Sequence, residues 1–221
     1  MRGCVASLML LASIDQTLAG DAKPSVHTFA KEQVGKTPPG WKIERTGAGE
    51  GSVWKVEADD TAPSESGHVL AQTASSPRAL FNLCVLDAVK AKNLAITVHF
   101  KAMLGDIDQG GGIVWRYQDD KNYYVARMNP NEDNYRLYKV VDGKRIQLAT
   151  AEKIKVPLGP WHTLSIKHVG KKIECSLDGK KLLEAEDDTI QAAGKTGLWT
   201  KADARTRFDL FTIHDFDAKA K

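Results

Sequence analysis

Regular alternation of apolar and polar side chains is the feature that most restricts the fold of this chain. In residues 95–101 the apolar side chains Ile96, Val98 and Phe100 stand at every second position. Successive side chains of a β-strand point to opposite faces, so this period of two indicates a strand with one buried and one solvated face. Similar alternation occurs on both sides of the turn expected at residues 169–171.

Turn residues separate such runs along most of the sequence. Asp142-Gly143 and Asp178-Gly179 each lie between β-like runs, which is a strong hairpin signal. We expect hairpins over residues 134–150, 161–177 and 172–186. Further strands are expected over residues 26–30, 52–58, 67–72, 79–86, 111–117, 122–129, 196–200 and 206–214. Only residues 187–193 allow a short helical turn. This pattern predicts an all-β fold, a two-sheet antiparallel β-sandwich.

The first residues have the composition of an export signal. Arg2 precedes an apolar run, and Ala19 ends a segment with small residues where a signal peptidase reads. The run is shorter than the roughly 20 apolar residues of a membrane-spanning helix. We therefore predict a signal peptide at residues 1–19, a single domain at residues 20–221, no membrane span, and a secreted or periplasmic location. A buried N-terminal helix is the alternative.

Charge and cysteine content exclude some classes of protein. The 31 basic and 28 acidic side chains leave a net charge of +3, which is too balanced to indicate a nucleic-acid partner. No dinucleotide or phosphate-binding fingerprint and no catalytic triad spacing is present in the sequence. Cleavage of the signal would leave Cys84 and Cys175, which could form one disulfide or be small core residues. The oligomeric state is not predicted.

Six motifs follow one another in a characteristic order. They are GGGIVWRY at 110–117, NYYVAR at 122–127, RLYKVVDG at 136–143, GPWHTL at 159–164, SLDG at 176–179 and GLWTKAD at 197–203. Their order resembles the concanavalin A-like lectin/glucanase superfamily, in its laminin-G-like jelly-roll branch. It is most similar to bacterial secreted proteins of the 3-keto-disaccharide hydrolase family, often named family 16 glycoside hydrolases. The resemblance covers about residues 26–214. It implies a jelly-roll sandwich that binds or cleaves a sugar.

The sequence departs from true family 16 glycosidases in one respect. Those enzymes carry Glu-x-Asp-x-x-Glu on one strand, where two carboxylates lie about 5–5.5 Å apart as acid and nucleophile. This chain lacks the motif, and its acidic cluster at residues 184–188 has a different spacing. We therefore expect an exported carbohydrate-binding or carbohydrate-processing domain. The alternative is a 3-keto-disaccharide hydrolase-type enzyme that cleaves a keto-sugar in a glycosidase-like or lyase-like reaction, with catalytic residues unknown.

A candidate ligand site comes from the central strands, where six Trp and Tyr residues fall within residues 115–138. Alternation assigns Ile113, Trp115 and Tyr117 to the core side of one strand, and Arg116 to the other side. The same reasoning on the next two strands places four side chains away from the core: Tyr123, Arg127, Arg136 and Tyr138. Trp199 and Lys201 could join them from another strand.

An aromatic platform beside arginines suits a sugar. The apolar face of the ring stacks on Tyr or Trp, and its hydroxyls accept hydrogen bonds from guanidinium groups. Arginines also hold carboxylate or sulfate groups, so the predicted partner is a carbohydrate or an anionic glycan on a concave sheet face. The alternative is a solvated face whose arginines pair with nearby acids: Asp119, Asp120, Glu132 or Asp133.

Loop acids raise the question of a metal. Relatives with a jelly roll often hold a structural calcium ion, which takes 6–8 oxygen ligands. Six acids lie in expected loops: Asp106, Asp108, Asp119, Asp120, Asp133 and Asp203. No loop has a recognisable calcium-binding repeat, so we predict no cofactor and no metal ligand, with a structural calcium ion as the alternative.

Overall fold

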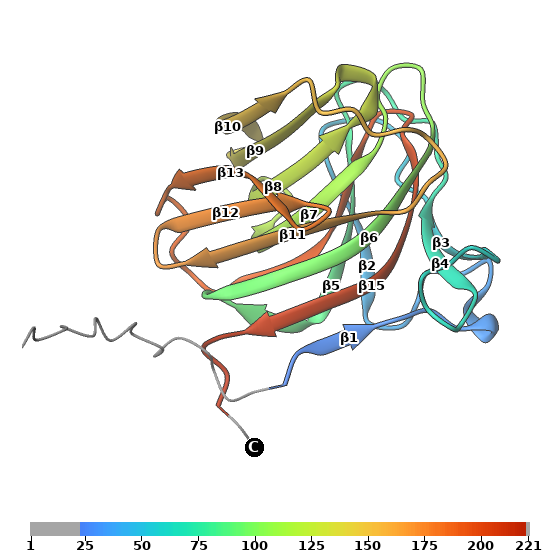
Figure 1. Cartoon of the computed structure of the whole chain (residues 1–221), viewed down its shortest axis with the longest axis horizontal. Coiled ribbons are helices and arrows are strands. Elements are labelled where there is room, and N and C mark those ends of the chain that lie inside the picture. The colour runs from blue at the N-terminus through green and yellow to red at the C-terminus, as the bar shows by residue number, and fades with distance from the viewer. Residues whose placement is uncertain (1–22, 220–221) are drawn as a thin grey trace, which may run out of the picture.

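The computed structural model of the chain describes residues 23–219, and the predicted signal peptide lies outside them. Two antiparallel sheets face one another (Figure 1). The eight-stranded sheet has the order β13 (Lys180–Glu186), β12 (Lys172–Leu177), β11 (His162–Val169), β6 (Leu94–Leu104), β15 (Arg205–Asp215), β4 (His68–Gln72) and β3 (Trp54–Ala58), with β1 (Ser25–His27) paired to β15. The seven-stranded sheet has the order β10 (Lys144–Glu152), β9 (Asn134–Val141), β8 (Asn122–Asn129), β7 (Gly111–Asp119), β14 (Gly194–Lys201), β5 (Phe81–Ala91) and β2 (Trp41–Thr46).

The predicted all-β sandwich is confirmed. All three expected hairpins form, as β9–β10, β11–β12 and β12–β13. The expected helical turn at residues 187–193 was wrong, because that segment is irregular and joins the two sheets. The short helices lie elsewhere, at η1 (Lys31–Gln33) and η2 (Pro130–Glu132). Among the described residues, no helix has the length and apolar character needed to cross a bilayer.

Side chains from the inner faces of both sheets form the main core. Trp115 of β7 stacks on Tyr124 of β8 and donates a 2.9 Å hydrogen bond from Nε1 to Nδ1 of His168 on β11. Burial, together with the nearby charge of Arg116, lowers the pKa of His168 to about 3. The imidazole is therefore neutral at physiological pH and Nδ1 can accept the hydrogen bond from the indole N–H, so a buried hydrogen bond connects the two sheets.

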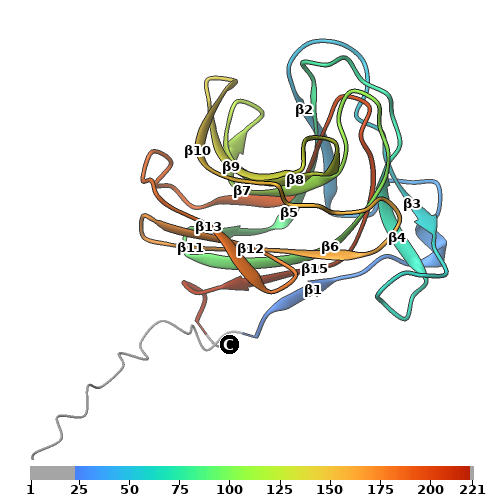
Figure 2. The same ribbon diagram turned by 45° about the horizontal axis from the view of Figure 1, so that its top comes forward.

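A second apolar cluster lies on the outer face of the seven-stranded sheet. It contains the buried side chains Phe81, Leu83, Val85, Val114, Tyr117, Tyr123, Val125, Tyr138, Val140 and Trp199. Figure 2 shows this sheet bent, with the β9–β10 hairpin and the β2 side rising on either side of that face. We call this outer face the concave face. The seven-stranded sheet therefore buries apolar surface on both sides.

Cys84 and Cys175 are both free and completely buried. They belong to the main core, on β5 of one sheet and β12 of the other. Of the two sequence-based alternatives, the structure supports small core residues rather than a disulfide. Burial raises the pKa of both thiols far above the usual range, so the reactive thiolate is scarce.

We predict that Cys84 and Cys175 react with a thiol reagent such as DTNB only after denaturation. In a Cys4→Ser background, the native protein should show almost no rapid thiol reaction, and the denatured protein should show two equivalents. Removal of reductant should leave the melting temperature unchanged. Fast labelling of either thiol in the native state would contradict this packing.

Candidate functional site

Strand register brings most of the predicted ligand residues onto the concave face. Arg127 of β8 lies opposite Arg136 of β9, and Tyr123 and Tyr138 lie on the same face in the same pair of strands. Trp199 of β14 joins them, because Gly112 of β7 is paired with both Trp199 and Arg127. Lys201 follows two positions later on β14, so six of the seven predicted side chains share this face.

Arg116 is the exception, and its predicted position was wrong. Its backbone has φ of 46°, and the β7 register shifts there, as in a β-bulge. The guanidinium leaves the concave face and donates to three backbone carbonyls, those of Lys92, Ile190 and Gly170, at 2.9, 2.9 and 3.0 Å. The extra residue also reverses the alternation beyond it. Tyr117, predicted to face the core, instead stacks on Tyr123 on the concave face.

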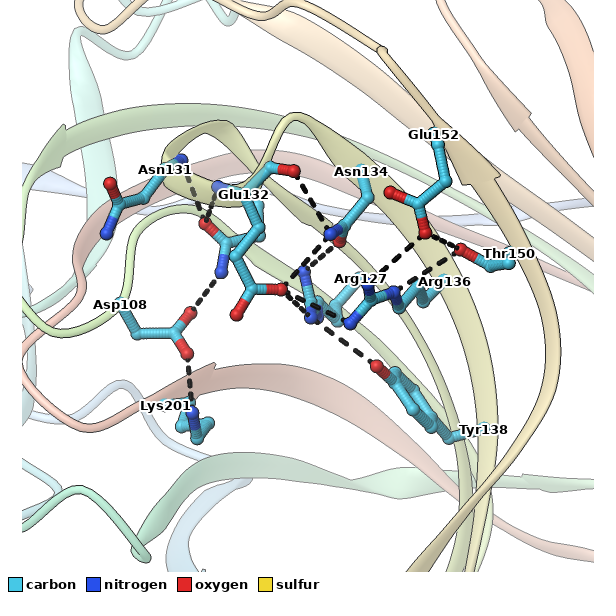
Figure 3. Close-up of polar contacts among 11 residues, drawn as sticks. Asp108, Arg127, Asn131, Glu132, Asn134, Arg136, Tyr138, Thr150, Glu152 and Lys201 are labelled. Atoms are coloured by element: carbon cyan, nitrogen blue, oxygen red, sulfur yellow. Dashed lines mark hydrogen bonds and ion pairs between the residues drawn. The ribbon is translucent and has the colours of Figure 1, made fainter.

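Arg127 is the centre of a polar network on this face (Figure 3). The side chain is 2% exposed, and it donates to Asn134 at 2.7 Å and to Glu132 at 2.8 Å. Burial opposes ionisation of Glu132, but the hydrogen bond and charge of Arg127 outweigh it and lower the pKa of Glu132 to about 2. Arg127 is therefore held in place by a firmly ionised partner, as the pairing alternative for these arginines anticipates.

Three further ion pairs extend the network along the strands. Asp108 accepts from Lys201 at 2.8 Å and from Asn129 at 2.9 Å. Burial raises the pKa of Asp108, and Lys201 partly offsets that effect. At the other side, Arg136 contacts Glu152 at 3.2 Å and also reaches Glu132 at 3.3 Å. These contacts connect residues from β8, β9, β10 and β14 in one hydrogen-bonded cluster (Figure 3).

Sequence reasoning missed Arg145 of β10. Its guanidinium lies over three rings of the concave face: Tyr138 at 4.4 Å, Phe81 at 5.1 Å and Trp199 at 6.0 Å. The register of the Asp142-Gly143 hairpin could have revealed it, because a two-residue turn places Lys144 opposite Val141 and Arg145 opposite Val140. Val140 belongs to the concave cluster, so Arg145 must share its face.

The hydrogen-bonding state of Arg145 differs from that of its neighbours. Nη1 is buried and has no hydrogen-bond partner among the described residues, and Nε of Arg127 is in the same condition. No carboxylate within the described part of the chain lies within 4.0 Å of Arg145. A buried donor without a partner costs free energy unless something else supplies the acceptor. The concave face thus combines aromatic rings with unused guanidinium donors, which is the combination that a sugar requires.

Two of the loop acids considered as calcium ligands, Asp203 and Asp108, have other partners. The carboxylate of Asp203 accepts from the backbone N–H groups of Asp106, Ile107 and Asp108, at 2.8–3.1 Å. Asp108 is held by Lys201 and Asn129, as described above. Across residues 23–219, no three acidic, histidine or cysteine side chains gather as ligands of a metal ion.

We predict that Arg116 acts through stability alone. Arg116→Met removes the donors for three carbonyls, and each buried unsatisfied group costs about 1–3 kcal/mol. The free energy of unfolding in urea should fall by about 3 kcal/mol or more. Ligand affinity of the folded fraction should stay at the wild-type value, and a selective loss of affinity would return Arg116 to the binding site.

A second prediction compares Arg127 with Arg145. Arg127→Met removes the donor to Asn134 and the shortest ion pair of Glu132, which keeps Arg136, so the unfolding free energy should fall by about 1–3 kcal/mol. Arg145→Met removes a partly buried charge that has no ion pair and keeps an apolar cover over the rings, so the change should be within about 1 kcal/mol. Chemical denaturation of both variants measures this. A larger loss for Arg145→Met would make its role structural.

Comparison with known proteins places this geometry in context. A model of the 3-keto-alpha-glucoside-1,2-lyase-like domain matches residues 32–213. The fold is similar to that of the carbohydrate-binding module CBM66 from Bacillus subtilis, with a TM-score of 0.64 at 16% identity, covering 86% of this chain and 100% of that one.

Two other solved structures show the same fold. Domain 4 of AbnA, a GH43 extracellular arabinanase from Geobacillus stearothermophilus in complex with arabinotriose, aligns with a TM-score of 0.54 at 11% identity, covering 88% of this chain and 94% of that one. The Ca2+/Man-bound exoplasmic/lumenal domain of VIP36 gives 0.55 at 11% identity, covering 88% and 92%. No curated protein matches. Because the family model spans most of the sequence, the chain belongs to the 3-keto-alpha-glucoside-1,2-lyase-like domain family.

Proposed function

We propose that this protein binds a carbohydrate on the concave face of its seven-stranded sheet. The observation that carries the proposal is that the Tyr138 and Trp199 rings lie beside buried guanidinium donors that have no hydrogen-bond partner within residues 23–219. Sugars need both an apolar surface for their ring face and donors for their hydroxyl groups. The names of solved structures with this fold, a carbohydrate-binding module and an arabinotriose complex, support it.

The proposed ligand residues are Tyr123, Arg127, Arg136, Tyr138, Trp199 and Lys201, with Arg145 in place of Arg116. Tyr138 and Trp199 are only 4% and 1% exposed, because the side chain of Arg145 lies over them. Ring stacking therefore requires Arg145 to swing aside. β10 is an edge strand and Arg145 has no ion pair in the described residues, so the movement breaks its cation–π contacts with the three rings but no ion pair. Tyr123 is buried within the concave cluster, and its hydroxyl forms a 2.8 Å hydrogen bond with the hydroxyl of Thr46.

A secreted or periplasmic location belongs to the same proposal. The N-terminal sequence has the pattern of an export signal. The arabinanase domain with this fold is extracellular, and the VIP36 domain is exoplasmic or lumenal. Polysaccharide ligands would be met in those compartments.

A second candidate function is enzymatic cleavage of a 3-keto-α-glucoside. Family membership favours it. A ketone at C3 makes the proton at C2 acidic, so a base could remove that proton while the substituent at C1 leaves with a proton from an acid. Asp108 is the acid that this face offers for the second step, since burial raises its pKa and makes the protonated form more accessible. Release of sugar from 3-keto-α-glucosides, lost in Asp108→Asn, would establish this function in place of simple binding.

The carbohydrate proposal predicts a specific effect of Tyr138→Ala. On a glycan array the wild type should bind at least one oligosaccharide class, and Tyr138→Ala should weaken that binding by about tenfold or more through loss of the stacking surface. Trp161→Ala is the matched control, because Trp161 directly precedes β11 of the other sheet, where its Nε1 donates to Thr61. Circular dichroism of each variant checks folding. Equal binding by both variants would place the site elsewhere.

A further inference from the structure

We propose that the sugar bound on the concave face carries a negative charge, as a carboxylate or a sulfate ester, and that Arg145 recognises this charge. The inference rests on the proposed function and specifies its ligand class. It assigns to Arg145 a role in selecting the ligand rather than in holding the fold.

Charge pairing on the concave face leaves Arg145 unmatched. The other basic side chains of the network each have a carboxylate within ion-pair distance: Lys201 has Asp108 at 2.8 Å, Arg127 has Glu132 at 2.8 Å, and Arg136 has Glu152 at 3.2 Å. Arg145 has none in residues 23–219. Glu44 lies on the same face on the distant strand β2, and it makes no ion pair with Arg145. Arg145 is therefore the basic side chain of this network without an ion pair in residues 23–219, and Asp108 and Glu132 attract its charge only from beyond ion-pair distance.

The position of Arg145 makes this lack of a partner costly. Burial lowers the pKa of Arg145, which reports the loss of hydration around its charge. Cation–π attraction to the faces of Tyr138, Phe81 and Trp199 offsets part of the free-energy cost of that lost hydration. Those contacts leave Nη1 without a hydrogen bond to any residue that the structure describes. An anionic acceptor would satisfy both the charge and the donor.

A second guanidinium lies close enough to share such an anion. Arg127 is 5.9 Å from the centre of the Tyr138 ring, and Arg145 is 4.4 Å from it. Nε of Arg127 has no partner among the described residues, whereas its Nη atoms are taken by Asn134 and Glu132. An anionic group beside Tyr138 would thus meet one free donor from each arginine. A sugar ring that carries the anion would then stack on the aromatic floor as Arg145 turns toward the charge.

Arg145 could instead be only a plug that shields the apolar cluster from water. The two roles differ in their dependence on charge. A plug is replaced by methionine without consequence for ligand choice, because Met covers the rings equally well. A recognition residue loses its preference for anions on the same substitution, because Met has no donor and no charge.

The test compares trisaccharides that differ only in charge. Neutral, uronate and O-sulfated forms of the same gluco-, galacto- and manno-trisaccharides are screened, and dissociation constants are measured by calorimetry at low salt. Wild-type protein should bind a charged form about 10- to 100-fold more tightly than its neutral form, the range expected for hydrogen bonds to a charged group. That preference should shrink as NaCl is raised. The uronate and sulfate arms show which anion is used.

Two variants make the result decisive. Arg145→Met should abolish the preference for the charged form, whereas Lys144→Gln, an exposed neighbour on the same strand, should keep the preference. Binding of neutral and charged forms with equal affinity overturns the inference but keeps the carbohydrate proposal. So does a charge preference that survives in Arg145→Met. Failure of every trisaccharide to bind the folded protein overturns both.

Discussion

The seven-stranded sheet is apolar on both faces, and much of the structure depends on burying the second face. The inner face packs on the eight-stranded sheet, as in any β-sandwich. The outer face has no sheet above it, yet its side chains, including Trp199, Tyr123 and Val125, are almost fully buried. The sheet bends around this face (Figure 2), and Arg145 lies over the rings of Tyr138, Phe81 and Trp199. Arg145 has no ion pair among the described residues, so a ligand could take its place over these rings.

The bulge at Arg116 separates structural from ligand-facing chemistry on a single strand. Before it, β7 alternates as expected, with Trp115 in the core against His168. At the bulge, Arg116 turns to the end of the sandwich and holds the turns at Lys92 and Gly170 and the segment at Ile190 through their carbonyls. After it, Tyr117 joins the concave cluster. Two arginines of similar sequence context, Arg116 and Arg127, therefore have unrelated roles.

Sequence reasoning succeeds where strands are regular and close in the chain. Arg127 and Arg136 share a face because β8 and β9 alternate without interruption and are joined by the short turn η2. The sandwich itself is predictable because Asp-Gly turns and period-two runs leave few other folds. The position of Arg116 is not predictable this way, since its bulge depends on carbonyls supplied by distant turns. The face on which Arg145 lies is predictable from the hairpin register. That its Nη1 has no hydrogen-bond partner among the described residues follows only from the packed structure.

NMR of the five tryptophan indoles during titration with a glycan from the array tests the concave-face site most directly. Trp199 lies on the concave face, Trp115 is in the main core, and Trp161 is on the side of the other sheet. The account predicts that the indole N–H of Trp199 shifts with saturation while those of Trp115 and Trp161 stay in place. Saturable shifts at Trp161, with Trp199 unchanged, would contradict it.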